Sequence, residues 1–263
     1  MSGPLRVERE DALLTLTLDR PDVLNAIDEE LTSALASALI DAAGDPRVRA
    51  VVITGEGRGF SSGQDLRDRL MLVADPSSLH LGRELKRRYH PVVTTLRTMR
   101  KPVIAAVHGV AAGAGFALAL ACDVRVAAAS ASFRAGWGRV GLAPDAGAAF
   151  FLPRLVGWGR AMDMMLTGEP VGADEALRIG LVARVFPDTE FAREWKSYAM
   201  TIARGATEAY ALTKEGLNAA WERDFASFLE VEADLQERAG RTHDYAEGVR
   251  AFAEKRRPRF TGE

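Results

Sequence analysis

The chain has 263 residues, and its 34 lysines and arginines against 36 aspartates and glutamates give a net charge of −2. This near balance disfavours nucleic acid and acidic membrane surfaces as partners, and the hydrophobic share of 48% excludes a disordered or fibrous chain. Cys122 is the only cysteine, which rules out an intrachain disulfide and favours a reducing compartment. The charged residues 1–11 do not resemble a signal peptide, and no apolar run approaches the ~18 residues of a membrane span. We therefore expect a cytoplasmic protein.

The first elements follow from hydrophobic spacing. Residues 5–18 alternate apolar and polar positions on either side of Asp11, which predicts a β-hairpin. Asp28 is placed to cap a helix whose apolar residues recur at helical spacing until residues 44–46 (Gly-Asp-Pro) end it. The apolar run 50–54 does not alternate, so it predicts a strand that is covered on both faces.

The same succession of helix and strand continues along the chain. Helices are predicted over 77–99 and 113–122, with a strand at 102–107 between them. Two short strands are predicted at 124–126 and 131–133, before a loop and a further helix. Alternation at this spacing favours an α/β fold in which helices cross over the faces of a parallel sheet.

The C-terminal part has a different pattern. From residue 191 to residue 260 the strand signal vanishes, and helix is predicted throughout. Apolar residues, among them Trp221, Phe225 and Phe228, are numerous for so short a segment. We therefore expect this region to pack on a partner subunit as well as on its own domain. The basic run 255–257 is interpreted as a solvated helix end, with a phosphate contact as the alternative.

Two glycine-rich segments follow predicted strands. Residues 109–115 lie between a strand and a helix, where main-chain N–H groups and the helix dipole favour negative charge. They do not form a nucleotide fingerprint, because Leu118 stands where the third glycine is required, and a plain tight turn is the alternative. Residues 55–66 follow the strand at 50–54. Loops after neighbouring parallel strands meet at one edge of a sheet, so that one amide from each can form an oxyanion hole.

Five motifs, in order along nearly the whole chain, resemble the enoyl-CoA hydratase/isomerase (crotonase) superfamily. They are RPDVLNA at 20–26, FSSGQDL at 60–66, VHGVAAGAG at 107–115, ACD at 121–123, and EGV with FAEKR between 247 and 256. The resemblance implies an α/β spiral of ββα units that acts on acyl-CoA thioesters and has no separate cofactor, since coenzyme A is part of the substrate. It also implies that the amides of Ser62 and Ala114 hold the thioester carbonyl.

The resemblance also implies a division of the chain. Residues 1–200 would form the spiral core that binds acyl-CoA, and residues 201–263 a helical trimerisation region. The protein would then be a homotrimer or a dimer of trimers. No cluster of metal ligands is visible in the sequence.

The acid and base residues must decide the reaction, because an oxyanion hole made of amides serves many reactions. In the hydratases of this superfamily two glutamates flank the substrate, and the matching positions here are Ala117 and Trp137. Neither side chain can move a proton, so hydration through paired carboxylates is disfavoured. Isomerases of the superfamily, the epoxyphenylacetyl-CoA type included, resemble this chain in carrying an aspartate at the place of Asp145, which is then expected to carry a proton between carbons. Without that resemblance, Asp145 would be interpreted as a helix cap.

A second subgroup also fits Asp145. The 4-chlorobenzoyl-CoA dehalogenases are similar around residues 133–137 and Asp145, and have a histidine at the place of His90. In that hypothesis Asp145 attacks an aromatic ring, the Trp137 indole N–H orients its carboxylate, and His90 activates water. The alternatives are that Trp137 is only a pocket wall and that His90, before Pro91, only marks a helix kink.

For the coenzyme A track, the resemblance suggests main chain near residues 23–26 and 64–66. The residues it marks as CoA-binding are Val23, Ala26, Gln64, Asp65, Leu66, Arg67 and Lys255. Arg67 and Lys255, the latter from a neighbouring subunit, would meet phosphate groups. The segment 67–90 is expected to cover the acyl pocket.

Three functions are therefore compared. The first is an isomerase that shifts a double bond or opens a strained ring in an acyl-CoA, with Asp145 moving the proton. The second is hydrolytic dehalogenation of an aromatic acyl-CoA, with Asp145 as nucleophile. The third is a catalytically silent acyl-CoA binder, because the hydratase glutamates are absent.

Overall fold

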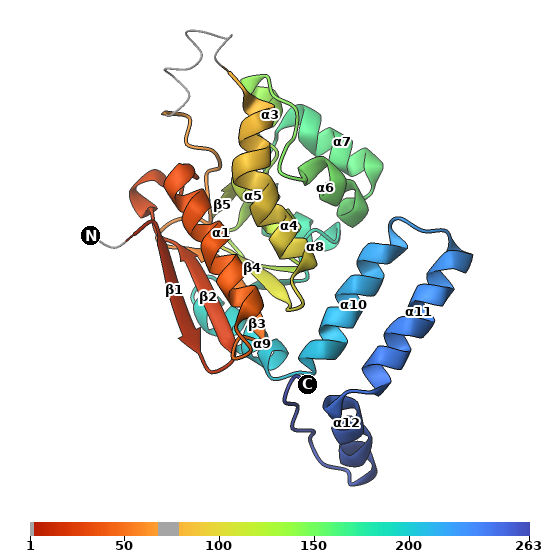
Figure 1. Cartoon of the computed structure of the whole chain (residues 1–263). Coiled ribbons are helices and arrows are strands. Elements are labelled where there is room, and N and C mark those ends of the chain that lie inside the picture. The colour runs from red at the N-terminus through yellow and green to blue at the C-terminus, as the bar shows by residue number, and fades with distance from the viewer. Residues whose placement is uncertain (1–2, 68–78) are drawn as a thin grey trace.

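The computed structural model describes residues 3–67 and 79–263. Its main sheet has the strand order β1-β2-β3-β4-β6-β9, in which β1 and β2 form an antiparallel hairpin and the other neighbours are parallel (Figure 1). The strands of this sheet are β1 (Leu5–Glu10), β2 (Leu13–Leu18), β3 (Ala50–Gly55), β4 (Val103–Val107), β6 (Val124–Ala128) and β9 (Arg184–Phe186). A second sheet has the order β5-β7-β8, with β5 (Val110–Ala112), β7 (Ser132–Arg134) and β8 (Val171–Gly172).

Helices follow the strands in the manner of a ββα spiral. The α-helices are α1 (Glu29–Gly44), α3 (Leu81–Glu84), α4 (His90–Thr98), α5 (Gly113–Ala121), α6 (Ala148–Val156), α7 (Trp158–Thr167), α8 (Ala173–Arg178), α9 (Phe191–Ala203), α10 (Thr207–Ala220), α11 (Phe225–Gly240) and α12 (His243–Ala253). The shorter turns are the 3-10 helices η1 (Pro21–Val23) and η4 (Trp137–Val140) and the π-helix η3 (Leu85–Tyr89). None of the helices in these two ranges is both long and apolar enough to cross a bilayer.

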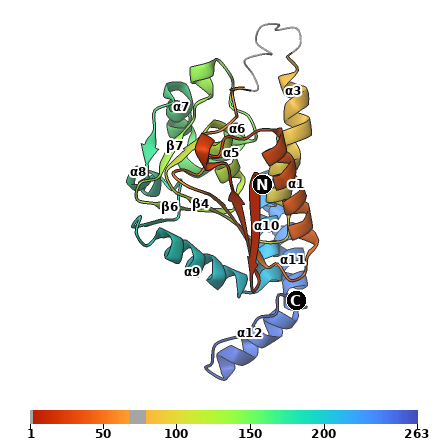
Figure 2. The ribbon, with the colours of Figure 1, turned by 90° about the vertical axis from the view of Figure 1, so that its left-hand side faces the viewer.

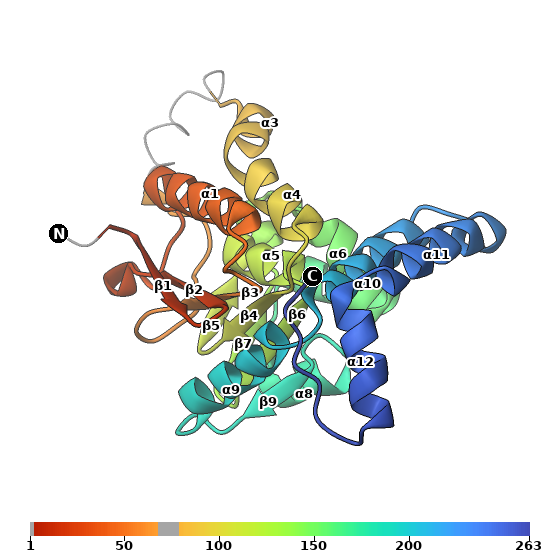
Figure 3. The same ribbon diagram turned by 60° about the horizontal axis from the view of Figure 1, so that its bottom comes forward.

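The main sheet is buried on both faces because its parallel strands are apolar at nearly every position. Leu14, Leu16 and Ile53 belong to the larger core, together with side chains of α1, α4 and α5. Their neighbours in the sequence, Leu13 and Val52, point to the other face and pack under α9. Figure 2 and Figure 3 show α1 and α9 on opposite sides of the sheet.

The predicted α/β architecture is confirmed, and most predicted elements are present. The Asp28 carboxylate accepts from the amide of Leu31 at 2.8 Å and caps α1 as expected. The helix predicted over 77–99 consists of α3, η3 and α4, and its residues 77 and 78 lie outside the described residues.

The prediction of helix up to residue 260 is wrong at its end. α12 stops at Ala253, because Lys255 has a φ of 54° in the left-handed region and Pro258 follows shortly after. The division proposed between residues 200 and 201 falls within α9, which still packs on the sheet. In Figure 1 the helices α10, α11 and α12 extend away from the two sheets.

Candidate active site

The two glycine-rich segments meet beside the second sheet. Ser61 forms a parallel bridge with Ala111, so that residues 61–65 run alongside the chain that leads into α5. Gly63 has a φ of 97°, and a Cβ placed on it would lie 2.7 Å from the Ala112 carbonyl oxygen and 3.3 Å from the Ala114 nitrogen. Glycine is therefore required at this point. The contact confirms that the two segments come together at one edge of the fold.

The start of α5 presents main-chain amides that have no acceptor within the helix. Ala112, the residue before the helix, provides no side-chain cap for the amides in the first turn of α5, Ala114 among them. The nine residues of α5 add a helix dipole whose positive end lies here. This end of α5 can therefore bind a carbonyl oxygen that gains negative charge.

The second amide is not the one predicted. The Ser62 amide donates to the Leu24 carbonyl at 2.8 Å, so that its hydrogen is used inside the protein, and the role predicted for Ser62 is corrected. Along an extended chain successive amides point in opposite directions. The Gly63 carbonyl and the Asp65 amide both bond to Ile27, so the amide of Gln64 faces the other side, where α5 begins. Within residues 3–67 and 79–263 the Gln64 amide has no acceptor.

Asn25 holds these segments in register, a role that the sequence analysis did not assign. Its side chain is fully buried, and its φ of 54° is left-handed. The Asn25 amide group donates to the carbonyl oxygens of Glu56 and Gly59 at 2.9 and 2.8 Å, and its own oxygen accepts from the Arg20 amide. The motif at 20–26 was visible in the sequence, but Glu56 and Gly59, which accept from Asn25, lie 31 and 34 residues further along the chain, and only the fold brings them to it.

Asp145 and Trp137 form a pair. The indole Nε1 of Trp137 donates to Oδ1 of Asp145 at 2.8 Å, and the indole is 5% exposed. Asp145 begins a turn in which its carbonyl accepts from the Ala148 amide, and both central residues, Ala146 and Gly147, have positive φ. α6 starts after this turn with no side-chain cap, so the interpretation of Asp145 as a helix cap is not supported.

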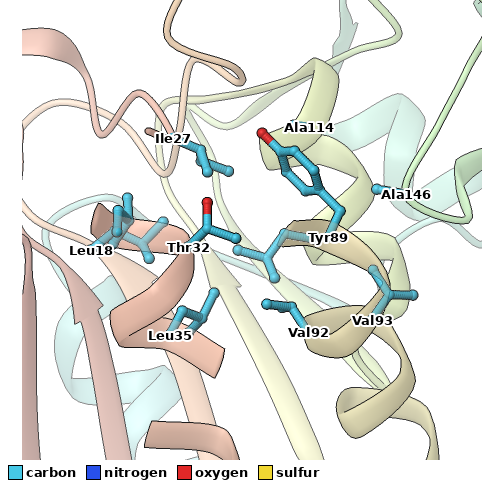
Figure 4. A pocket seen from close by; sticks show the side chains of 11 residues that line it. Leu18, Ile27, Thr32, Leu35, Tyr89, Val92, Val93, Ala114 and Ala146 are labelled. Carbon is cyan, nitrogen blue, oxygen red and sulfur yellow. The ribbon is translucent and has the colours of Figure 1, made fainter. Parts of the chain in front are cut away.

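A small apolar cavity lies beside both features. Its volume is about 20 Å³, room for one water molecule, and its walls come from α1, the start of α4, α5 and the Asp145 turn. Ala114 and Ala146 line one part of it, next to the candidate amide and the candidate carboxylate respectively (Figure 4). Val92 and Val93 of α4 and Tyr89, the last residue of η3, contribute another part. Part of the segment expected to cover an acyl pocket, residues 68–78, lies outside the described residues.

His90 does not join this group. It is the first residue of α4 and is exposed, and it does not line the cavity although its neighbour Tyr89 does. Its imidazole makes no hydrogen bond or ion pair with any part of the chain that the structure describes. The structure thus brings Trp137 and Asp145 together but does not place His90 with them, and the role of His90 as a base stays a prediction.

Four of the predicted coenzyme A residues lie together at positions 64–67, but two of them, Asp65 and Arg67, form an ion pair with each other. Asp65 is buried and pairs with Arg67 through two hydrogen bonds of 3.0 and 2.8 Å, and also with Arg20 at 3.3 Å. The hydrogen bonds from Arg67 hold the pKa of Asp65 at about 2. Arg67 itself is largely exposed, and its role at a phosphate stays a prediction.

The remaining predicted residues are distributed along the chain. Val23 and Ala26 lie on either side of Leu24 and the buried Asn25, and Leu66 is half exposed next to Asp65. Lys255 follows α12, at the end of the chain that Figure 1 shows far from α5. Within one chain Lys255 therefore cannot serve this site, and its predicted role requires another copy.

Comparisons with known proteins agree with this geometry. The model of the enoyl-CoA hydratase/isomerase family matches residues 8–263. A probable enoyl-CoA hydratase of Rhodobacter capsulatus is 44% identical over 98% of both chains, and the 1,2-epoxyphenylacetyl-CoA isomerase of Escherichia coli is 41% identical over 96% of both. The 4-chlorobenzoyl coenzyme A dehalogenase-2 of an Arthrobacter species is 35% identical, over 95% of this chain and 91% of its own.

A solved structure supports the same assignment. The putative enoyl-CoA hydratase/isomerase from Mycobacterium abscessus superimposes with a TM-score of 0.93 at 36% identity, over 98% of this chain and 100% of that chain. The chain therefore belongs to the enoyl-CoA hydratase/isomerase family, and it is an enzyme of that family. The resemblance inferred from the five sequence motifs is confirmed.

Proposed function

We propose that this enzyme acts on an acyl-CoA thioester as an isomerase, with Asp145 as the residue that carries the proton. The hydrogen bond from Trp137 to Asp145 carries the proposal, because it fixes the carboxylate next to Ala146, which lines the same cavity as Ala114. The fully buried Ala117 and the indole of Trp137 occupy the places expected for the two hydratase glutamates, so Asp145 is the acid or base that remains.

The reaction divides into two proton transfers. The Asp145 carboxylate takes a proton from the carbon next to the thioester carbonyl, and the electron pair of that C–H bond moves to the carbonyl oxygen as an enolate. The amides of Gln64 and Ala114 stabilise this oxygen, and one such donor contributes roughly 3–4 kcal/mol. Asp145 then returns the proton to a carbon further along the acyl group, the double bond shifts, and no cofactor is consumed.

Replacing Asp145 by Asn tests the proposal. The substitution retains an oxygen that can accept from Trp137 but removes the base, and we expect kcat with a 3-enoyl-CoA to fall at least about a hundredfold. Epoxyphenylacetyl-CoA is assayed in parallel for ring opening. Asp163→Asn, at an exposed position on α7, is the matched control and should retain full activity. Unchanged turnover in Asp145→Asn would rule out the assigned role.

Hydrolytic dehalogenation is the second candidate, and the same hydrogen bond favours it. An indole N–H that orients the carboxylate suits a nucleophile as well as a base. An oxygen of Asp145 would displace halide from an aromatic ring to form an aryl ester, which water would cleave to a phenol and the free carboxylate. Halide release from a halobenzoyl-CoA that is lost in Asp145→Asn, without turnover of enoyl-CoA, would establish this activity in place of isomerisation.

The binding of coenzyme A and the assembly complete the proposal. Main chain around Val23, Ala26 and residues 64–66 would follow the pantetheine and adenine, with Arg67 and the Lys255 of another copy near phosphate groups. The helices α10–α12 would hold a trimer or a dimer of trimers. Tight binding of acyl-CoA without turnover of any thioester tested would instead identify a silent binder.

A further inference from the structure

We infer that Tyr89 is a positioning residue: its hydroxyl orients the Gln64 turn for the thioester carbonyl while its ring forms a wall of the acyl pocket. The inference rests on the proposed function, since it assigns a task at the same site. Tyr89 is 7% exposed and lines the cavity that Ala114 and Ala146 also line. In Figure 4 its hydroxyl points toward the end of the cavity where Ile27 and Ala114 lie.

The hydroxyl makes one informative contact. It donates to Oε1 of Gln64, the residue whose main-chain amide faces the start of α5. The main chain on either side of Gln64 is already held, because the Gly63 carbonyl and the Asp65 amide bond to Ile27 at 2.7 and 3.0 Å. The Tyr89 bond fixes the side chain of the same residue. The orientation of the Gln64 peptide is thereby set from both the main chain and the side chain.

The backbone places Tyr89 here through an unusual turn. Residues Leu85–Tyr89 form a π-helix between α3 and α4, and such wider turns are often found at functional sites. Tyr89 is the last residue of this segment, and Pro91 follows in the first turn of α4. Helical spacing alone predicts an ordinary amphipathic helix over this region, so the contact between Tyr89 and Gln64 was not predictable from the sequence.

The consequence concerns the substrate. The cavity walls are apolar side chains apart from Thr32 and the Tyr89 hydroxyl, which favours an apolar ligand, alkyl or aryl. The volume of about 20 Å³ holds one water molecule, so these side chains must move apart before an acyl group can enter. An acyl group that enters in this way would touch the Tyr89 ring, while its carbonyl would lie at the amides of Gln64 and Ala114. Tyr89 thus couples occupation of the pocket to the geometry of the oxyanion hole.

Tyr89→Phe tests the inference, because it keeps the ring and removes the hydroxyl. The probe is butyryl-CoA with a ¹³C carbonyl, whose stretching frequency falls when protein amides polarise it. We expect a smaller fall in Tyr89→Phe than in the wild type, with kcat for a 3-enoyl-CoA about five- to tenfold lower and KM within about threefold. Tyr198→Phe on α9, on the other face of the sheet, is the matched control and should behave as the wild type.

Gln64→Met removes the acceptor without changing the pocket wall, and it should reproduce the Tyr89→Phe spectrum. The double variant should be no worse than either single one, since both remove the same bond. A wild-type carbonyl shift that is unchanged in both variants would overturn the inference and leave the proposed function standing. No carbonyl shift in the wild type itself would instead contradict the proposed oxyanion hole.

Discussion

At the scale of single residues, the proposed chemistry depends on the Trp137–Asp145 pair. Neither partner is held by regular secondary structure alone, since Trp137 opens the 3-10 turn η4 and Asp145 precedes a turn with two left-handed residues. Ala146, one of these, is a non-glycine residue at a φ of 46°, a conformation that costs energy and is concentrated at functional sites. The strained turn and the buried indole together hold the Asp145 carboxylate, whose neighbour Ala146 lines the cavity.

Trp137→Phe measures what the indole N–H contributes. The variant keeps an aromatic wall and removes the donor, so Asp145 loses a hydrogen bond to a charged group, which is worth about ten- to a hundredfold in rate. We expect kcat to fall by that factor in steady-state assays. Trp158→Phe, at a residue that is 72% exposed, should leave kcat unchanged. Full activity in Trp137→Phe would show that the indole N–H is not needed and that Trp137 serves only as a pocket wall.

The residue scale also shows why one predicted amide was wrong. The motif at 60–66 located the correct turn, but consecutive amides in an extended segment face opposite sides. Which of Ser62 and Gln64 faces the ligand depends on the register against Leu24 and Ile27, and that pairing is formed between distant parts of the chain. Spacing along the sequence contains no signal for it, whereas Ala114, which the family resemblance marked, lies in the first turn of α5.

At the scale of elements, the last residues of the chain are fastened to α12 rather than continuing it. Glu247 accepts two hydrogen bonds from Arg256, at 2.6 and 2.9 Å, and one from the Arg259 amide at 2.8 Å. Asp244 accepts from the amides of Thr261 and Gly262 at 2.7 and 2.8 Å. The basic run at 255–257 was interpreted as a solvated helix end. Its Arg256 instead forms an ion pair with Glu247, which holds the last residues of the chain against α12.

Glu247→Gln should release this tail in a pH-dependent way. The hydrogen bonds from Arg256 lower the pKa of Glu247 from 4.5 to about 2, so the folded state favours the ionised form. The stabilisation is therefore complete above about pH 4.5 and is lost as the pH falls towards 2. Hydrogen exchange at residues 256–263 should be faster in the variant at neutral pH, and the difference should shrink on acidification. A difference that grew as the pH fell would contradict this assignment.

At the scale of the whole molecule, the arm of α10–α12 leaves apolar surface uncovered. Phe252 is 88% exposed, Phe225 77%, Tyr245 58% and Val249 52%. Exposed patches of this kind mark contacts between proteins. α11 has no buried residue, which suits a helix that completes its packing against another copy. The hypothesis of a trimer or a dimer of trimers is consistent with this surface, and it is open to direct measurement.

Phe252→Ser should weaken the assembly. Removing a large apolar side chain from an interface costs affinity, so the mass measured by light scattering should move from that of a trimer or hexamer towards the monomer as the protein is diluted. Leu166→Ser, at a residue that is 74% exposed on α7 outside the arm, is the matched control. A wild-type protein that is monomeric at all concentrations would contradict the assigned role of the arm.

The fold was predictable over most of its length because its signals are local. The strands at 50–54 and 102–107 are continuous apolar runs, and α1 has both a cap and a stop signal. Asp145 and Trp137 were identified because the family motif marks them. Their hydrogen bond, and the hydrogen bond from Tyr89 to Gln64, arise only from tertiary packing. Asn25 shows the same limit, since its acceptors at Glu56 and Gly59 are remote in the sequence.

Exchange of the proton next to the thioester tests the central claim most directly. The enzyme is incubated in D₂O with a 3-enoyl-CoA and with its saturated counterpart, and deuterium at the carbon beside the carbonyl is followed by mass spectrometry. We expect the wild type to catalyse this exchange and Asp145→Asn to lose it while it still binds the thioester. Bound thioester that gains no deuterium in the wild type, or equal exchange in the variant, would contradict an enolate formed by Asp145.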